Sequence, residues 1–324
     1  MIEVKNLVKK YGTHLAVDHL DFQLEPGRIY GFLGPNGAGK STTMNIMTGY
    51  LGATEGAVVI DGHDILKEPE EAKKHIGYLP ELPPLYMDMT VLEYLEFAAE
   101  LKEIPKKERE ASVQKVMDIT KLNDVQFRLI KNLSKGYRQR VGLAQAILGF
   151  PDIIILDEPT VGLDPKQIIE IRELIRELAK EHTVILSSHI LAEVREVCDY
   201  IMIISRGKLV ASDTPENLEH LMAGQNSLEI ETKTEPERVR KILRSISGVD
   251  KIELERTEEA TTYARIETET AASGENQDIR EAIFLAFAEA GCPLLMLKAS
   301  KASLEEVFME LTQGEEATAD AGDL

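Results

Sequence analysis

The stretch "IYGFLGPNGAGKSTT", residues 29–43, decides how the rest of the chain is interpreted. A short apolar run typical of a buried strand enters a glycine-rich turn, and a helix is expected to begin at Lys40. The turn "GPNGAGKS", residues 34–41, fits G-x-x-x-x-G-K-[ST] in the strand–turn–helix context that this pattern requires. Its glycines let backbone N–H groups surround phosphate oxygens, Lys40 neutralises their charge, and the Ser41 hydroxyl can ligate magnesium. The sequence therefore predicts a phosphate site on an α/β sheet.

Two further strand ends carry polar side chains that suit the same site. The run "IIIL", residues 153–156, delivers Asp157 and Glu158 to the carboxyl end of a strand, where open α/β sheets bind ligands. Asp157 suits magnesium, and Glu158 can orient or deprotonate a water molecule. His189 follows "TVILSS", and one ring nitrogen could touch a γ-phosphate or the attacking water. Without the phosphate loop, an Asp-Glu pair is more often a helix cap or a solvated turn, and a strand-end histidine is usually structural.

The stretch "LSKGYRQRVGLAQAIL", residues 133–148, opens a helix with a second Ser-x-Gly turn. Such a turn offers a hydroxyl and backbone N–H groups at the positive end of a helix, which suits an anion. The anion could belong to another chain. Without the other motifs, an ordinary helix cap would be the better interpretation of Ser134.

The pattern along the chain predicts two domains and a tail. Residues 1–66 read as short strands with an Asp61-Gly62 turn, and a helical insertion occupies about residues 90–148 within a mainly parallel, covered sheet. Residues 1–220 form this first domain. Residues 226–312 have the order βαββαβ of a ferredoxin-like α+β unit. Residues 313–324 are expected to be a disordered acidic tail.

Composition and charge exclude several function classes. The chain of 324 residues has 37 basic and 56 acidic residues and a net charge of −19, which disfavours nucleic acid as a partner. Its apolar runs are far shorter than the ~20 residues that span a bilayer, and the N-terminus lacks the apolar stretch of a signal peptide. Cys198 and Cys292 are too few for a disulfide framework, so we expect reduced core thiols in a cytoplasmic protein.

Together these residues resemble the nucleotide-binding subunit of an ATP-binding cassette (ABC) transporter over about residues 1–220. The resemblance implies a P-loop ABC ATPase fold with an antiparallel β subdomain, in which Tyr11 stacks on adenine. Asp157 and Glu158 would end the Walker B strand, Asp164 would belong to the D-loop, and His189 would be the switch histidine. The Walker A residues on the ATP phosphates would be Gly34, Pro35, Asn36, Gly37, Ala38, Gly39, Lys40, Ser41 and Thr42.

Two positions depart from the family pattern. "LSKGY" replaces the usual LSGGQ but keeps Ser134 and Gly136, which in the family close over ATP held by the opposite subunit. Glu81, in "IGYLPELPPLY", stands where the family usually has a glutamine that contacts magnesium and the membrane partner. A carboxylate oxygen of Glu81 could still ligate the ion, although the prolines around it also suit a plain surface loop.

The arrangement of these motifs along the chain resembles that of ATPases of the ABC-2 type export class, including gliding-motility and drug-resistance relatives. It implies an ATPase that uses ATP and Mg²⁺, dimerises with a second copy and drives a separate membrane-spanning permease from the inner face of the cell membrane. Glu158, His189 and Lys40 would be its catalytic residues. The alternative is a soluble ABC protein acting on ribosomes or DNA, but such relatives carry two cassettes or long coiled coils, and neither occurs here. The C-terminal unit could sense a ligand, dimerise or dock.

Overall fold

The structure is a computed structural model that describes residues 1–221, 227–256, 261–268, 279–300 and 308–309. The chain divides into two compact units with the boundary between Pro215 and Glu216. The predicted division into residues 1–220 and 226–312, as domains that fold separately, stays a prediction. Among the described residues, no helix combines the length and the apolar character that crossing a bilayer requires.

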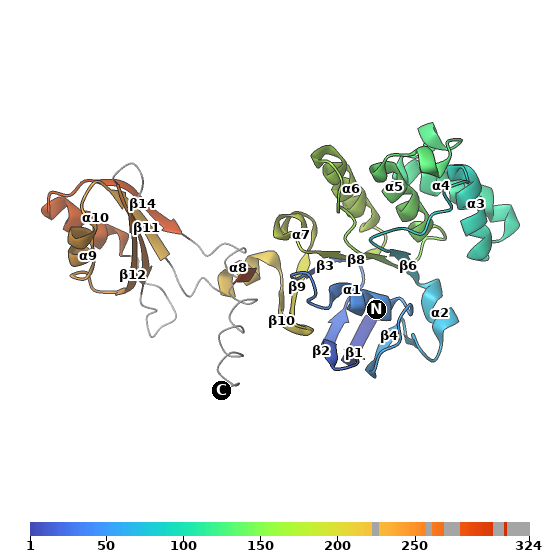
Figure 1. The fold of residues 1–324 in the computed structure, drawn as a ribbon, viewed down its shortest axis with the longest axis horizontal. Coiled ribbons are helices and arrows are strands. Elements are labelled where there is room, and N and C mark those ends of the chain that lie inside the picture. Colours follow the sequence, from blue (N-terminus) through green and yellow to red (C-terminus); the bar gives the residue numbers. More distant parts are fainter. Residues whose placement is uncertain (222–226, 257–260, 269–278, 301–307, 310–324) are drawn as a thin grey trace. The chain divides into compact units, whose positions relative to one another are not determined.

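A six-stranded sheet forms the centre of the first unit (Figure 1), with the strand order β10-β9-β3-β8-β7-β6. All neighbours are parallel except β10, which is antiparallel to β9. Every residue of β3, β7 and β8 is buried, because helices and a second sheet cover both faces. The strands are β3 (Ile29–Leu33), β6 (Ile76–Leu79), β7 (Ile153–Leu156), β8 (Thr183–Ser188), β9 (Tyr200–Ser205) and β10 (Lys208–Asp213).

A four-stranded antiparallel sheet with the order β2-β1-β4-β5 completes the core of this unit. Its strands are β1 (Ile2–Tyr11), β2 (His14–Leu24), β4 (Glu55–Ile60) and β5 (His63–Asp64). The predicted Asp61-Gly62 turn joins β4 to β5 with φ values of 47° and 88°, as a two-residue hairpin turn requires. Apolar side chains of this sheet, of β3 and of the first helix share one core, to which Phe32, Met44 and Ile60 contribute.

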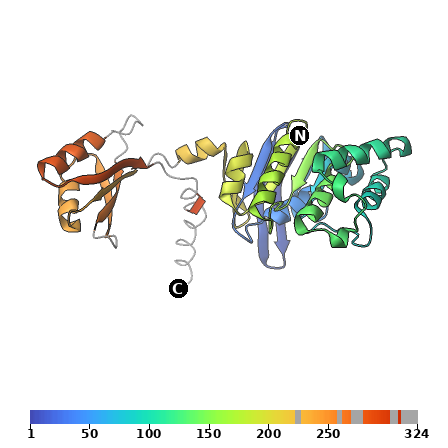
Figure 2. The ribbon, with the colours of Figure 1, turned by 90° about the horizontal axis from the view of Figure 1, so that it is seen from above.

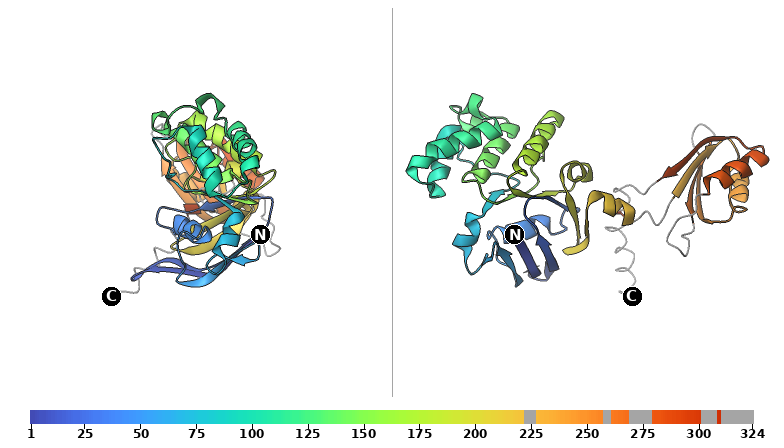
Figure 3. Two further views of the ribbon diagram at one scale, coloured as in Figure 1. Left: turned by 90° about the vertical axis from the view of Figure 1, so that its right-hand side faces the viewer. Right: turned by 180° about the vertical axis from the view of Figure 1, so that it is seen from behind.

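The helices cover the six-stranded sheet from two sides. In both views of Figure 3, helices α3, α4 and α5 of the predicted insertion lie on the opposite side of this sheet from the antiparallel sheet. Helix α3 begins with a capping box in which Thr90 and Glu93 satisfy each other's backbone N–H groups. The helices of the first unit and the boundary are α1 (Lys40–Met47), α2 (Pro69–Lys74), α3 (Val91–Leu101), α4 (Lys106–Thr120), α5 (Lys135–Ile147), α6 (Pro165–Leu178), α7 (Leu191–Val197) and α8 (Pro215–Leu221), with 3₁₀ turns at Asn123–Val125 and Ile130–Asn132.

The second unit has the predicted order βαββαβ. Its elements are β11 (Ser227–Thr232), α9 (Pro236–Leu243), β12 (Val249–Arg256), β13 (Thr262–Thr268), α10 (Arg280–Glu289) and β14 (Leu294–Ser300). The strands form an antiparallel sheet in the order β12-β13-β11-β14, and both helices pack on one of its faces (Figure 2). The last predicted helix, "SLEEVFMELT", lies outside the described residues except for positions 308–309, and the predicted acidic tail lies entirely outside them. Cys198 and Cys292 are buried free thiols, as predicted.

Candidate active site

The glycine-rich loop between β3 and α1 holds a conformation that its glycines make possible. Gly37 and Gly39 have φ values of 81° and 104°, in the left-handed region that side chains with a Cβ rarely enter. A Cβ on Gly39 would also lie only 2.5 Å from the Ala16 carbonyl oxygen. The loop folds back over the first turn of α1, where Lys40 Nζ donates to the carbonyls of Gly34 at 2.8 Å and Pro35 at 3.2 Å. The loop and its lysine are therefore preorganised in the chain itself.

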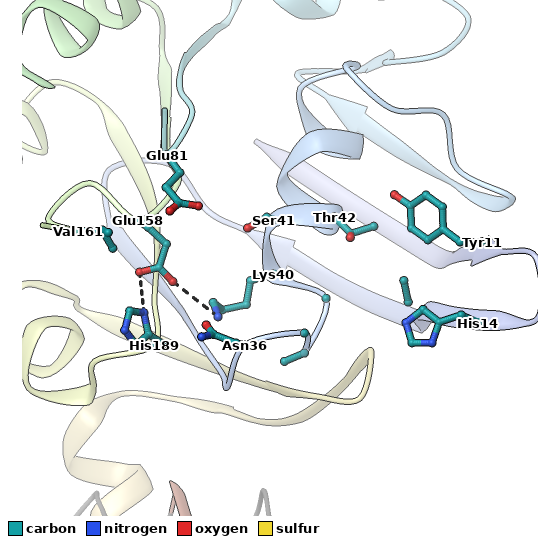
Figure 4. A pocket seen from close by; sticks show the side chains of 14 residues that line it. Tyr11, His14, Asn36, Lys40, Ser41, Thr42, Glu81, Glu158, Val161 and His189 are labelled. Atoms are coloured by element: carbon teal, nitrogen blue, oxygen red, sulfur yellow. Dashed lines mark hydrogen bonds and ion pairs between the residues drawn. The ribbon is translucent and has the colours of Figure 1, made fainter. Parts of the chain in front are cut away.

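This loop forms one wall of a pocket of about 470 Å³. In Figure 4, Tyr11 lies at one end, Glu158 and His189 lie at the other, and Lys40 lies between them. The pocket thus has an aromatic ring at one end and charged side chains at the other. Its lining residues are Tyr11, His14, Ala16, Asn36, Gly37, Ala38, Gly39, Lys40, Ser41, Thr42, Glu81, Glu158, Val161 and His189.

Glu158 connects the two catalytic candidates on either side of it. One carboxylate oxygen lies 3.7 Å from Lys40 Nζ and the other lies 3.0 Å from His189 Nδ1 (Figure 4). Lys40 and Glu158 are only 5% and 7% exposed. Burial lowers the pKa of Lys40, and the negative charges of Glu158 and Asp157 oppose that shift. The backbone of Glu158 has a φ of 47°, which is sparsely populated for residues other than glycine, and the turn after β7 holds it in this conformation.

Asp157 occupies the centre of a second set of contacts. Its Oδ1 accepts hydrogen bonds from Ser41 Oγ at 3.1 Å and Ser187 Oγ at 2.6 Å. Ser187 Oγ also accepts from the backbone N–H of Glu158 at 2.9 Å, so it braces both acidic residues. No cluster of three or more His, Cys, Asp or Glu side chains suited to a metal occurs in the described part of the chain. Magnesium needs no such cluster, since it is commonly held by one carboxylate with hydroxyl, water and phosphate oxygens, and the adjoining Ser41 and Asp157 oxygens fit that arrangement.

The Ser-x-Gly turn is not part of this pocket. Ser134 is the N-cap of α5, and its Oγ accepts a 3.3 Å hydrogen bond from the Tyr137 backbone N–H. Tyr137 donates its hydroxyl to Asp124 at 2.8 Å, which ties the start of α5 to the 3₁₀ turn at Asn123–Val125. Gly136 faces Gln167 and lines a separate pocket with Asp164, the N-cap of α6. Within one chain the capping interpretation of Ser134 is correct, and its contact with a second chain's ATP stays a prediction.

Glu81 does line this pocket, from the loop after β6, but its role as an ion ligand stays a prediction. Sequence reasoning missed four residues here: His14, Ala16 and Val161 in the lining, and Ser187 behind Asp157. Ser187 carried a weak signal, a hydroxyl at the end of a buried strand. The other three carried none, because the packing of β2 and of the turn after β7 brings them to the pocket.

Comparison with known proteins shows the family of this chain. The sequence model described as ABC transporter matches residues 17–161. The chain is 41% identical over 212 residues to the bacitracin transport ATP-binding protein BcrA of Bacillus licheniformis, covering 65% of this chain and 68% of that protein. It is 32% identical over 321 residues to the uncharacterized ABC transporter ATP-binding protein YcbN of Bacillus subtilis (strain 168), covering 98% of this chain and 99% of that one.

A solved structure shares the fold of the first unit. It is the dimeric post-hydrolysis state of the ATP-binding cassette MJ0796 bound to ADP and Pi, with a TM-score of 0.60 and 27% identity, covering 66% of this chain and 98% of that one. These similarities confirm the predicted resemblance to export-class ATPases, and they do not favour a soluble ABC protein acting on ribosomes or DNA. The chain belongs to the ABC transporter family, as one of its ATP-hydrolysing, ATP-binding subunits.

Proposed function

We propose that two copies of this chain close around two ATP molecules and that hydrolysis drives a separate membrane-spanning permease. One observation carries this proposal: a single pocket brings Lys40, Ser41, Glu158 and His189 together, with Asp157 hydrogen-bonded to Ser41. Tyr11, at the other end of the pocket, offers a ring on which adenine can stack. The phosphates would then extend along residues 34–42 toward Glu158.

The contacts of Lys40 suggest how binding prepares the reaction. In the structure, Glu158 is the anionic partner of Lys40. Entering phosphates supply a denser negative charge, so Lys40 exchanges Glu158 for phosphate oxygens and the carboxylate becomes free to bind water. That water attacks the γ-phosphorus while Glu158 accepts its proton, and the bond to the ADP oxygen breaks with its electron pair remaining on ADP. His189, in contact with Glu158, can hydrogen-bond the γ-phosphate or this water.

Magnesium would be held by Ser41 Oγ and a carboxylate oxygen of Asp157, with Glu81 as a further oxygen ligand. It would supply charge neutralisation on the β- and γ-phosphates when bound. Ser41 Oγ donates a 3.1 Å hydrogen bond to Asp157 Oδ1 in the structure, so the two oxygens are already neighbours. The remaining ligands would be phosphate and water oxygens.

The transport direction is inferred from relatives. BcrA is named for bacitracin transport, and a further relative is named as a probable multidrug transporter ATP-binding protein. We infer that this subunit powers export and works at the cytoplasmic face of the membrane, held there by its permease. Glu81 is a candidate for coupling, since it lies at once in the pocket and on the exposed Pro-rich loop.

Mixed dimers test the shared site. Lys40→Ala disables the phosphate loop, and Ser134→Arg blocks the turn that we place over the partner's ATP. Each variant alone should be inactive. A mixed dimer contains one site with intact Lys40 and intact Ser134, so mixing should restore up to about half of the activity per mixed dimer if the sites act independently.

The matched control is Ser134→Ala, which removes the cap of α5 without filling the turn. It should cost about 1 kcal/mol of stability and leave ATPase activity measurable. Subunit exchange is verified with two differently tagged copies. Confirmed exchange without any recovery of activity, together with no crosslink between the turn and the partner's phosphate loop in ATP, would show that Ser134 only caps its helix.

A further inference from the structure

The second unit has one sheet face that its own helices leave uncovered within the described residues. Leu228, Ile230, Ala264 and Ile266 point into the core beneath α9 and α10. The alternate positions of the same strands therefore lie on the opposite face. We call this the ladder face, and it consists of Glu229, Glu231, Lys251, Glu253, Glu255, Tyr263, Arg265, Glu267, Met296 and Lys298.

The strand register arranges these side chains in rows across the sheet. One row runs Glu253, Arg265, Glu229 and Lys298 from β12 through β13 and β11 to β14, so the charge changes sign at every strand. The next row runs Glu255, Tyr263, Glu231 and Met296. Within one chain, opposite charges on neighbouring strands stabilise a sheet by a few tenths of a kcal/mol to about 1 kcal/mol per pair. A second copy of the chain carries the same alternation of charge, so its row can be matched against this one.

We propose that the ladder face packs against the ladder face of a second copy, about a two-fold axis that runs along the strands. This axis keeps each row opposite itself but reverses the order of the strands. Glu253 then faces the partner's Lys298, and Arg265 faces the partner's Glu229. In the second row, Tyr263 faces the partner's Glu231. The charges along this row are minus, plus, minus and plus from Glu253 to Lys298. When the partner's row runs in the opposite direction, each charge therefore faces a charge of opposite sign.

Other arrangements and partners fit less well. A two-fold axis across the strands would place Glu253, Arg265 and Glu229 each against its own copy, which opposes like charges. The ladder face carries five glutamates against two lysines and one arginine, which disfavours nucleic acid and anionic lipid. A second copy provides both signs at the spacing that the first presents.

The contact is too small to hold two free chains together. With strands ~4.8 Å apart and ~3.4 Å between residues, the face measures roughly 19 by 17 Å, or ~300 Å², well below the ~800 Å² per partner of a stable interface. It therefore depends on the dimer around ATP that we proposed above. Once that dimer forms, the second contact is intramolecular and acts at an effective concentration in the mM range. The ladder contact should be weakened by salt, because Glu253 and Lys298 at its edges are exposed and the charges between them are only half-buried.

Crosslinking in the full-length chain tests the arrangement. Both copies carry Glu158→Gln to retain ATP, one has Glu253→Cys and the other has Lys298→Cys, and a short bis-maleimide joins them. In the proposed dimer these positions lie face to face, with backbones ~10 Å apart. The matched control has Glu253→Cys in both copies, which places the thiols three strand intervals apart, ~17 Å in all. Cys198 and Cys292 are buried and should not react.

We expect at least fivefold more crosslinking in the Glu253–Lys298 pair than in the control, with ATP present and at low salt. In a second set, copies with Glu255→Cys and Met296→Cys report on the neighbouring row. Adding Glu253→Lys to both copies should suppress their crosslink, because lysine then faces lysine twice per dimer. Adding Lys298→Glu as well should restore it.

Size-exclusion chromatography of the same samples separates the two proposals. If no ATP dimer forms, the proposed function and the ladder contact both fail. If the dimer forms but the facing pair crosslinks no more than the control, the ladder contact alone is overturned, and the face is bare or belongs to another partner.

Discussion

Glu158→Gln should reveal the carboxylate as the resting charge partner of Lys40. The Lys40 Nζ to Glu158 Oε1 distance of 3.7 Å corresponds to an attraction of about 4–5 kcal/mol at an effective dielectric constant of ~20. Neutralising Glu158 also recovers several kcal/mol of desolvation cost, and the amide oxygen can still accept a hydrogen bond. We therefore expect a net destabilisation of about 1–2 kcal/mol without nucleotide. In a unit of this size that lowers Tm by about 2–8 °C.

ATP should remove this defect. Phosphate oxygens replace the missing charge beside Lys40, and ATP at 100 times its Kd stabilises the folded state by about 2.7 kcal/mol. The variant should therefore gain more Tm from ATP than the parent chain does, while its steady-state hydrolysis falls by at least a hundredfold. Differential scanning fluorimetry with and without ATP, in a chelator that prevents turnover, measures the first effect, and phosphate release with magnesium measures the second.

The matched control is Glu81→Gln, which removes the same charge from the same pocket but outside the contacts of Lys40. Its Tm without nucleotide should stay within about 1 °C of the parent, because an exposed charge contributes little. An unchanged or raised Tm in Glu158→Gln, or equal effects of the two substitutions, would refute the charge-partner assignment.

Three further outcomes follow from packing and burial. Gly31→Ala should cost about 1–3 kcal/mol in urea denaturation, because its Cβ would lie 2.3 Å from Val194 Cγ1, whereas Gly52→Ala, with open space around its Cβ, should be nearly neutral. Burial raises the pKa of the Cys198 thiol, so a thiol reagent should label this residue only after the chain unfolds. Because the folded pKa lies above the unfolded value of about 8.5, the contribution of Cys198 to the free energy of unfolding is full below pH ~8.5 and declines above it. Thr90→Ala should lower stability by about 1 kcal/mol through loss of the capping box, while Thr90→Ser should retain most of it, and equal losses in thermal unfolding would contradict the capping role.

Local patterns in the sequence were sufficient to predict much of the fold and part of the candidate site. The strand, glycine turn and helix around Lys40 could be predicted because a phosphate loop needs glycine conformations and a following helix within a few residues. The apolar run of β7 predicted that Asp157 and Glu158 lie at the carboxyl end of a strand. The hydrophobic periodicity of each segment predicted the order βαββαβ of the second unit. These features depend on neighbours in the chain, so backbone preference and hydrophobic pattern determine them.

Only the tertiary structure decided which distant segments meet. Nothing near His14 or Ala16 in the sequence shows that β2 lies beside the loop at residues 34–42, and the hydrogen bond from Ser187 to Asp157 depends on β8 pairing with β7. The rows of the ladder face likewise depend on a register among four strands that a shift of one residue would invert. Strand neighbours and register are set by the burial of whole faces, which is a property of the packed chain and not of any one segment.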